Sequence, residues 1–297
     1  MVKLEHIVKN LHASIRFNTY CEANITEIPS RKGVKKAIER GELLLNGQEV
    51  EGGRWLKEGD IITWVNSSRK PPKTFPLELK VLFEDHYLAV IEKPAGFSVS
   101  GNQYKTIYNA LGHNLQPSSE KDALPWPLPA HRLDNPTRGL LIIAKTTNAR
   151  IKLGEAFEQK TIQKTYHALV VGKPEKKGEL KGAIDRKKAH TKYELIDSVP
   201  ACKGDFLSLL KLHPLTGRTH QLRKHCAGMG TPILGDAIYG KEGLILKQKG
   251  LFLAATGLLF QHPINGKTIH LETGIPEKQL KRLAYEERRY LSQSKNK

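Results

Sequence analysis

Residues 131–145 read His-Arg-Leu-Asp-Asn-Pro-Thr-Arg-Gly-Leu-Leu-Ile-Ile-Ala-Lys, a polar loop that runs directly into a long apolar stretch. Asparagine, proline and glycine favour a turn, and the uninterrupted apolar run is typical of a buried strand. Asp134 therefore lies on a loop held by rigid structure, where functional groups tend to project. An aspartate in a turn more often hydrogen-bonds the local backbone, so this stretch alone favours a structural role.

Strand-like runs continue outward from this stretch, at 79–83, 87–91, 140–144, 166–171, 193–196 and 206–212. Helical periodicity separates them at 148–159, 220–228 and 277–291. In the last helix, Leu280, Leu283, Ala284 and Leu291 fall on one side, which is expected to pack over the first two turns. Because short connections join many strands, an α+β domain with an antiparallel or mixed sheet is expected, rather than a doubly wound parallel one.

A second polar segment, Leu-Thr-Gly-Arg-Thr-His-Gln-Leu-Arg at 215–223, precedes one of these helices. Gly217 is expected to allow a tight approach, and Thr219 to cap the helix that follows. Arg218 and Arg223 offer forked donors for a carboxylate or a phosphate. A charged first turn of a helix explains the segment equally well.

A third segment, Gln-Lys-Thr-Tyr-His-Ala-Leu-Val-Val-Gly at 163–172, reads as a strand with Tyr166 at its entry. A tyrosine there usually belongs to the core or to the sheet surface. It can also stack on a nucleobase.

Composition favours a polyanionic partner. The 297 residues include 48 lysines and arginines against 30 aspartates and glutamates, a formal charge of +18. Neutralising phosphates with such cations releases counterions and favours binding. Three widely spaced cysteines suit a reducing cytosol, and no signal peptide or membrane span is evident. We therefore expect a soluble, cytoplasmic, monomeric protein.

The segment Asn-Ser-Ser-Arg-Lys-Pro-Pro-Lys at 66–73 breaks every periodicity and predicts a linker over 67–74, between domains at 1–66 and 75–297. In the first domain, Ser30 is expected to cap a helix over 31–40 that ends at Gly41. Its exposed side carries Lys32, Lys35 and Lys36. A Leu-Leu-Leu run, an Asn-Gly turn signal and a second apolar run at 61–65 follow.

This order resembles the αL RNA-binding module, a small α/β unit named for a ribosomal protein, and the resemblance assigns the three lysines to RNA contact. An ordinary solvated basic helix is the alternative. Residues 1–75 carry a net charge of +4, so the remaining residues carry +14. Most of the attraction for a polyanion therefore belongs to the larger domain.

The three polar segments together resemble the RluA-like family of RNA pseudouridine synthases. The resemblance includes Asp-His-Tyr-Leu-Ala-Val-Ile-Glu-Lys-Pro-Ala-Gly at 85–96 and Gly-Asp-Ala-Ile-Tyr-Gly at 235–240, in the expected order over about 77–274. It implies a mixed, mostly antiparallel central sheet with flanking helices, and an active site in a cleft across it. The implied partner is ribosomal or transfer RNA, and the implied reaction converts uridine to pseudouridine without a cofactor.

The resemblance also assigns roles to single residues. Asp134 matches the aspartate that attacks a flipped-out uridine, either at the base or at the sugar; the sequence leaves that choice open. Arg223 matches its arginine partner and Tyr166 the tyrosine that stacks on the base. Arg132 matches a residue that fills the gap left by the base or contacts RNA. The residues expected to shape the site or to bind substrate are His131, Thr137, Arg138, Arg218, Thr219, His220 and Gln221.

Two departures from the family pattern stand out. Thr137-Arg138-Gly139 replaces a usual Thr-Ser-Gly, and Leu253-Ala254-Ala255 replaces Leu-His-Ala. The first puts substrate choice in doubt more than chemistry, and the second affects packing or substrate contact.

Other functions are less well supported. His220 and His225 are five positions apart, which does not suit one face of a helix, so we expect no metal site. A catalytically silent RNA-binding or ribosome-assembly factor is the main alternative, and a phosphate-ester hydrolase lacks a convincing nucleophile.

Overall fold

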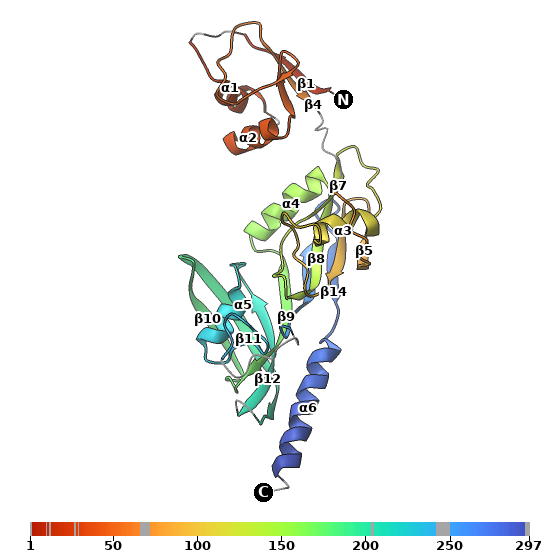
Figure 1. The fold of residues 1–297 in the computed structure, drawn as a ribbon, viewed down its shortest axis with the longest axis vertical. Coiled ribbons are helices and arrows are strands. Elements are labelled where there is room, and N and C mark those ends of the chain that lie inside the picture. The colour runs from red at the N-terminus through yellow and green to blue at the C-terminus, as the bar shows by residue number, and fades with distance from the viewer. Residues whose placement is uncertain are drawn as a thin grey trace. The chain divides into compact units, whose positions relative to one another are not determined.

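The protein is described by a computed structural model that covers residues 2–9, 11, 13–26, 28, 30–65, 72–202, 205–241 and 250–294. The chain forms two compact units, Met1–Pro71 and Pro72–Lys297, each with a hydrophobic core of its own (Figure 1). Most of the segment predicted as a linker, 67–74, lies outside the described residues. Within the described residues, none of the helices combines the length and apolar character needed to cross a membrane.

The first unit packs two helices against an antiparallel sheet of order β1-β4-β2-β3. Its elements are β1 (Val2–Ile7), α1 (Phe17–Asn24), α2 (Arg31–Glu39), β2 (Leu43–Leu45), β3 (Gln48–Glu49) and β4 (Ile61–Val65). Ser30 Oγ accepts a hydrogen bond from Gly33 N at 3.1 Å, which confirms the predicted helix cap. Asn46 and Gly47 both have positive φ, which confirms the predicted tight turn.

The second unit is built on a ten-stranded sheet with main order β10-β11-β12-β9-β13-β8-β6-β5. Strand β14 pairs with β13, β7 pairs with β8, and the described pairs are antiparallel except β8 with β13. This confirms the expected α+β class with a mixed, mostly antiparallel sheet. The strands are β5 (Lys80–Glu84), β6 (Leu88–Lys93), β7 (Ala123–Pro129), β8 (Arg138–Thr146), β9 (Gln163–Val171), β10 (Lys177–Ile184), β11 (Lys187–Pro200), β12 (Phe206–Pro214), β13 (Leu253–Gln261) and β14 (Thr268–Glu272). The helices are α3 (Ile107–Asn114), α4 (Thr147–Glu158), α5 (Gln221–Gly228) and α6 (Glu277–Ser294).

Both faces of the sheet are covered by helices, which explains the continuous apolar runs of its central strands. In β8, Leu141 and Ile143 pack into the cluster that contains α3. Their neighbours Leu140 and Ile142 point to the other face, into the cluster that contains Leu153 of α4. Strands β9 and β12 alternate in the same way between a cluster with α5 and a cluster with α6. The loops and helix starts that form the site are therefore supported on rigid strands.

The β5-β6-β8 part of the sheet meets the β9–β12 part at β13. Strand β13 runs parallel to β8 for only two residue pairs, Arg138 with Ala254 and Gly139 with Ala255. Gly139 has a φ of +124°, and a Cβ built on it would lie 2.0 Å from the Ala255 carbonyl oxygen. An L-side chain suits neither the backbone conformation nor the space. Glycine at this position is what allows β8 to reach β13.

The predicted packing side of the C-terminal helix is wrong in part. In the first two turns of α6, Leu283 is buried but Leu280 and Ala284 are exposed. Leu291 lies beyond these turns and is exposed, as expected. Polar Gln279 and Glu286 take the buried positions instead. The Gln279 amide donates to the backbone carbonyl of His167 at 3.0 Å, and Glu286 pairs with Arg282 in the helix. These partners satisfy only part of the buried polar atoms, since Gln279 Oε1 and Arg282 Nε have no hydrogen-bond partner among the described residues. Apolar periodicity does not reveal such positions.

Replacing Gly139 with alanine is expected to lower the free energy of unfolding by at least ~2 kcal/mol, because the left-handed backbone and the Ala255 contact both oppose a methyl group. Urea denaturation followed by circular dichroism measures the loss. The matched control is Gly154→Ala in α4, where an added Cβ meets nothing within 4 Å. Helix propensity predicts a gain of about 1 kcal/mol for the control. Equal stability of Gly139→Ala and the wild type would contradict the close approach.

Candidate active site

Asp134 lies in the loop between β7 and β8, and the backbone of this loop is firmly held. Thr137 N donates to the Asp134 carbonyl at 3.0 Å, which closes the turn. Gly96 N and the Lys93 ammonium both donate to the Asn135 carbonyl, at 2.9 and 3.1 Å. Backbone groups and a lysine thus satisfy the turn, and the Asp134 carboxylate is left for other contacts.

Lys93 is a fully buried cation beneath this loop. Its ammonium also donates to the carbonyls of Pro94 and Phe97, at 2.9 and 2.8 Å. Burial lowers the pKa of Lys93 to about 8, and the charge of Asp134 acts in the opposite direction. Lys93 therefore ties the loop of Asp134 to the end of β6 and places a cation below the carboxylate.

Two cavities share the Asp134 side chain. One, of about 560 Å³, extends toward residues 98–100 and 235–238; the other, of about 570 Å³, extends toward β9 and residues 214–220. The residues that line both are Arg132, Leu133, Asp134, His220 and Arg223. The Asp134 side chain is 17% exposed. The carboxylate can therefore be reached from either cavity while staying mostly shielded from water.

Arg223 of α5 divides its guanidinium between two carboxylates. Its Nε and Nη2 donate to Asp236 at 2.8 and 2.7 Å, in a forked pair that is almost fully buried. Its Nη1 lies 3.6 Å from Asp134 Oδ2, within the range of an ion pair but too far for a hydrogen bond. The predicted arginine is thus beside Asp134, but its fork belongs to Asp236.

Asp236 is held as an anion. It also accepts hydrogen bonds from the backbone N–H groups of Ile238 and Tyr239, at 3.0 and 3.1 Å. Burial raises the pKa of Asp236, but the hydrogen bonds from Arg223 and these two N–H groups lower the pKa by more, so the net shift is downward. A charged Asp236 fixes the position of Arg223.

Tyr239 and His220 form a chain of contacts that leads from Arg223 to the Asp134 carboxylate. The Arg223 guanidinium lies 5.2 Å from the centre of the Tyr239 ring, and the Tyr239 hydroxyl is 3.1 Å from His220 Nδ1. His220 Nε2 lies 3.9 Å from Asp134 Oδ1. His220 has a φ of +56°, a left-handed conformation that is uncommon outside glycine.

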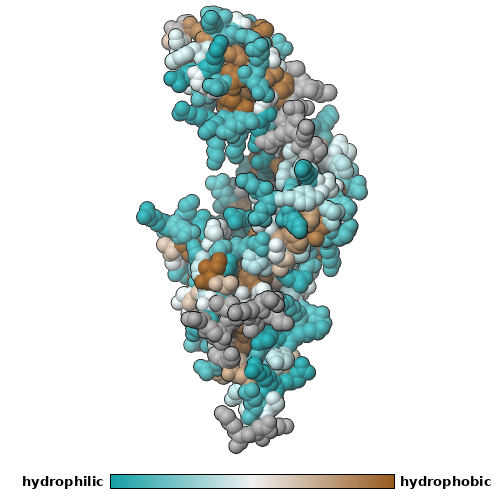
Figure 2. Space-filling model, in the orientation of Figure 1, coloured by the Kyte–Doolittle hydropathy of each residue, from teal (hydrophilic) through white to brown (hydrophobic). Residues whose placement is uncertain are grey.

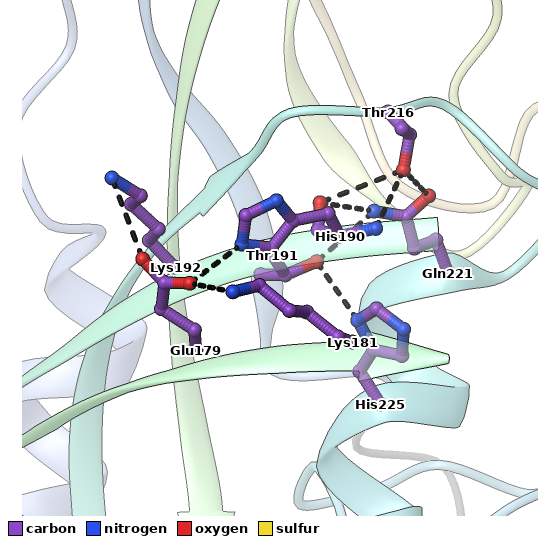
Figure 3. Close-up of polar contacts among 8 residues, drawn as sticks. All are labelled: Glu179, Lys181, His190, Thr191, Lys192, Thr216, Gln221 and His225. Carbon is purple, nitrogen blue, oxygen red and sulfur yellow. Dashed lines mark hydrogen bonds and ion pairs between the residues drawn. The ribbon is translucent and has the colours of Figure 1, made fainter. Parts of the chain in front are cut away.

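Gln221 binds the loop before α5 to strand β11. Its Oε1 accepts hydrogen bonds from Thr216 Oγ1 at 2.7 Å and from Arg218 N at 3.1 Å. Its Nε2 donates to the His190 carbonyl and to Thr191 Oγ1, both at 3.0 Å. Figure 3 shows the Gln221 amide with Thr216, His190 and Thr191. Gln221 is buried, so this predicted binding residue shapes the site from within.

Tyr166 lines the second cavity together with Asp134 and Arg223. It lies in β9, in register with Leu212 and Ala255 of the neighbouring strands. Burial raises the pKa of Tyr166 well above its ordinary value, and the charge of Asp134 raises it further. Tyr166 therefore presents a neutral phenol to the cavity.

The other predicted residues of the Asp134 loop lie in different surroundings. His131 Nε2 accepts from Ile142 N at 3.0 Å, and its ring packs on Phe157. Burial lowers the pKa of His131 to about 3, with the charge of Lys164 acting in the same direction, so its ring is neutral. Thr137 is buried, and its hydroxyl has no hydrogen-bond partner among the described residues. Arg132 is exposed on the rim of both cavities.

Arg138 faces a different region. It forms an ion pair with Glu92 of the neighbouring strand β6. It lines a third cavity, of about 380 Å³, that does not include Asp134. The departure from the family pattern at this position therefore lies outside the two cavities that share the carboxylate.

Two expectations for the loop before α5 are wrong. A Cβ added at Gly217 would meet nothing within 4 Å, and Gly217 does not have a positive φ; the left-handed residue of this loop is His220. Thr219 is exposed and does not cap the helix, which begins at Gln221 with His220 in the cap position and without a side-chain cap bond. The Gln221 side chain reaches back and accepts from Arg218 N, a group that precedes the helix. Arg218 itself lines the second cavity and donates through Nε to the Lys188 carbonyl at 3.1 Å.

Some predicted features are not part of this site. Lys32, Lys35 and Lys36 are exposed on α2 and belong to the first unit. Among the described residues, no group of three or more His, Cys, Asp or Glu side chains could hold a metal ion.

Three residues of the site were not singled out from the sequence. Asp236 and Tyr239 belong to the 235–240 segment, and Lys93 to the 85–96 segment, so each lay within a motif already noted. The motifs did not reveal their partners, because the fork from Arg223 and the lysine bond to Asn135 each join different motifs, 13 and 42 residues apart in the chain.

Comparisons with known sequences agree on one family. Residues 87–228 match the family model described as RNA pseudouridylate synthase. One relative is the ribosomal large subunit pseudouridine synthase C of Rickettsia felis, 33% identical, with the match covering 82% of this chain and 88% of the relative. Another is the ribosomal large subunit pseudouridine synthase D of Nitrosomonas europaea, 32% identical over 77% of this chain and 71% of the relative.

Solved structures share the fold. Human RNA pseudouridylate synthase domain containing 4 superposes with a TM-score of 0.54 at 24% identity, over 69% of this chain and 93% of that chain. Human RNA pseudouridylate synthase domain containing 1 gives a TM-score of 0.55 at 23% identity, over 66% of this chain and 83% of that chain.

Replacing Asp236 with asparagine is expected to cost ~3–5 kcal/mol of stability near neutral pH, because Arg223 then keeps its buried charge without an anionic fork partner. The folded-state pKa of Asp236 lies below its ordinary value of 3.8, so its contribution is complete above that value and is lost as the pH falls through the folded-state pKa. The stability difference between wild type and variant should therefore shrink only below pH 3.8. Urea denaturation at a series of pH values measures it, with exposed Asp197→Asn as the control. If the stability difference between wild type and Asp236→Asn stayed the same above and below pH 3.8, the ion pair would be contradicted.

Proposed function

Because the chain belongs to the RNA pseudouridylate synthase family, we propose that it converts uridines in ribosomal or transfer RNA to pseudouridine, with Asp134 as the attacking group. The observation that carries the proposal is the position of this carboxylate. It is shared by two cavities, has Arg223 at 3.6 Å, and lines the second cavity together with Tyr166.

The reaction exchanges one bond of the nucleotide for another. The bond between the sugar C1′ and N1 of the base breaks, a bond between C1′ and C5 forms, C5 loses a proton and N1 gains one. No oxidant, reductant or co-substrate is consumed, so we propose that no cofactor takes part. A carboxylate is suited to this task, since it is a nucleophile at neutral pH and leaves readily from an ester-like adduct.

The geometry around Asp134 favours a reactive carboxylate. A forked salt bridge would occupy lone pairs on both of its oxygens, but the Arg223 fork is taken by Asp236. Arg223 still places a positive charge 3.6 Å from Oδ2, which orients the carboxylate. Asp134 is therefore oriented without being bound by the arginine fork.

A uridine within an RNA helix has to leave its stack before the carboxylate can reach it, at a cost of a few kcal/mol. The neutral Tyr166 in the second cavity supplies an aromatic surface for the extruded base. Exposed Arg132 on the rim of both cavities is placed to contact the RNA or to fill the gap in the stack.

Basic side chains near the site support an RNA substrate. The hairpin of β10 and β11 exposes Lys181, Arg186, Lys187, Lys188 and Lys192. Arg218 on the wall of the second cavity donates to the Lys188 carbonyl, which joins the hairpin to the site. Hydrophilic residues also cover most of the second unit on the face drawn in Figure 2. Together with the +14 charge carried beyond residue 75, these side chains offer many phosphate contacts.

We propose further that the first unit is an αL-type RNA-binding module over residues 1–66, followed by a linker at 67–74 and a catalytic domain at 75–297. Exposed lysines on α2 support an RNA contact of the module. We also propose that the protein works as a monomer in the cytoplasm, where its RNA substrates are accessible.

Replacing Asp134 with asparagine is expected to abolish isomerisation, because the amide is not a nucleophile. The assay is tritium release to water from RNA labelled at uridine C5. Binding of the RNA, measured by filter retention, should stay within about threefold, since phosphate contacts dominate affinity. The control is His270→Asn on β14, where the replaced side chain is exposed. Tritium release by Asp134→Asn at the wild-type rate would exclude Asp134 as the attacking group.

Changing Lys32, Lys35 and Lys36 together to glutamine tests the module. If all three contact phosphates, the slope of log affinity against log salt should fall by about 2–3, at ~0.7–0.9 per lost contact. The catalytic rate at saturating RNA should not change, because the substitutions lie in the other unit. A wild-type slope would mean that these lysines do not contact RNA.

A further inference from the structure

We propose that His220 is a positioning residue for Asp134, and that it acts with Arg223 to hold one carboxylate oxygen each. The inference rests on the proposed function, since it assigns a role in the same reaction. It follows from three features: the separate contacts of the two oxygens, the hydrogen bond from Tyr239, and the strained backbone that presents His220.

The two oxygens of Asp134 face different groups. Arg223 Nη1 is 3.6 Å from Oδ2, and His220 Nε2 is 3.9 Å from Oδ1. Both distances exceed a hydrogen bond, and catalytic contacts of this kind tighten when substrate binds. One donor on each oxygen fixes the plane of the carboxylate. A single donor leaves that plane free to rotate.

We assign the tautomer of the imidazole from the groups that its two nitrogens face. An ionised carboxylate can only accept hydrogen bonds, so the His220 nitrogen that faces Asp134, Nε2, carries the proton. Nδ1 then accepts from the Tyr239 hydroxyl, 3.1 Å away. Tyr239 is held in turn by its backbone N–H, which donates to Asp236 Oδ1 at 3.1 Å. Asp236 therefore secures both partners of Asp134, Arg223 directly and His220 through Tyr239.

The backbone at His220 is strained, in the conformation that presents its side chain to Asp134. Its φ of +56° and ψ of +25° place a non-glycine residue in the left-handed region, at a cost of ~1–3 kcal/mol. The loop that precedes it is bound to β11 through Gln221, Thr216 and the His190 carbonyl (Figure 3). Strain that is overcome by such a network is typical of a side chain that has to be presented in one direction.

The side chains around the His220 imidazole also indicate that its partner is Asp134. Asp134 comes from the loop before β8, Arg223 from α5, and Tyr239 from the segment that follows α5. Arg132 lines both cavities on the side of the Asp134 loop. The only negative side chain among these four is Asp134, and it is the group that Nε2 faces.

Two substitutions at His220 distinguish the loss of the hydrogen-bond donor to Asp134 from an effect on the left-handed backbone. In His220→Gln, the amide NH₂ can reach the place of Nε2, so a donor to Asp134 is kept. In His220→Asn, the side chain is too short to reach, while asparagine tolerates the left-handed backbone. We expect His220→Asn to lower kcat for tritium release by about 10- to 100-fold, the scale of a misplaced reacting group, with KM within about twofold. His220→Gln should recover most of that loss.

A double-mutant cycle tests the link through Tyr239. Tyr239→Phe removes the hydroxyl and keeps the ring over Arg223, so it should lower kcat in the wild-type background and have little further effect in His220→Asn. His270→Asn is the control for histidine replacement and should retain wild-type kcat. Thermal melting of each variant confirms that it is folded.

The outcomes are distinct. Recovery in His220→Gln together with non-additive effects of Tyr239→Phe supports the proposal. Wild-type kcat in His220→Asn overturns it, and so does an equal loss of kcat in His220→Asn and His220→Gln. If the wild-type protein releases no tritium from any labelled ribosomal or transfer RNA, the proposed function itself fails, and the role of His220 with it.

Discussion

The close approach of Gly139 to the backbone of Ala255 is the constraint on which the site depends. At this point β8 and β13 run parallel for two residue pairs, and β13 joins the two parts of the sheet. Asp134 lies five residues before Gly139 in the chain, whereas Tyr166 and Arg223 lie on β9 and α5. The carboxylate and its neighbours therefore come from opposite parts of the sheet, and their distances follow from how closely those parts meet.

Within that frame, the electrostatics of the site depend on an uneven division of charge. Arg223 serves two carboxylates, with a buried fork to Asp236 and one remaining nitrogen toward Asp134. Lys93 adds a second cation beneath the loop, bound to backbone carbonyls. Asp134 thus lies near two cations, Arg223 and Lys93, whose hydrogen bonds go mainly to other groups. Such an arrangement orients the carboxylate and leaves its lone pairs available for a covalent step.

The fold could be predicted from local pattern because continuous apolar runs and helix caps depend on neighbouring residues. Leu140–Ala144 and Ser30 were predicted in this way and were confirmed. The site was less accessible to such reasoning, because its decisive contacts join distant segments. Nothing local indicated that the Arg223 fork would go to Asp236, or that His220 rather than Gly217 would be left-handed. The buried Gln279 was missed for the same reason, since its partner is a backbone carbonyl in β9.

Arg138 has a consequence for how this chain and its relatives diverge. Its guanidinium pairs with Glu92 of the adjacent strand, outside the two cavities that share Asp134. An arginine here and a carboxylate at position 92 form a unit, and losing either leaves the other charge without its partner. The two positions are therefore expected to change together in evolution.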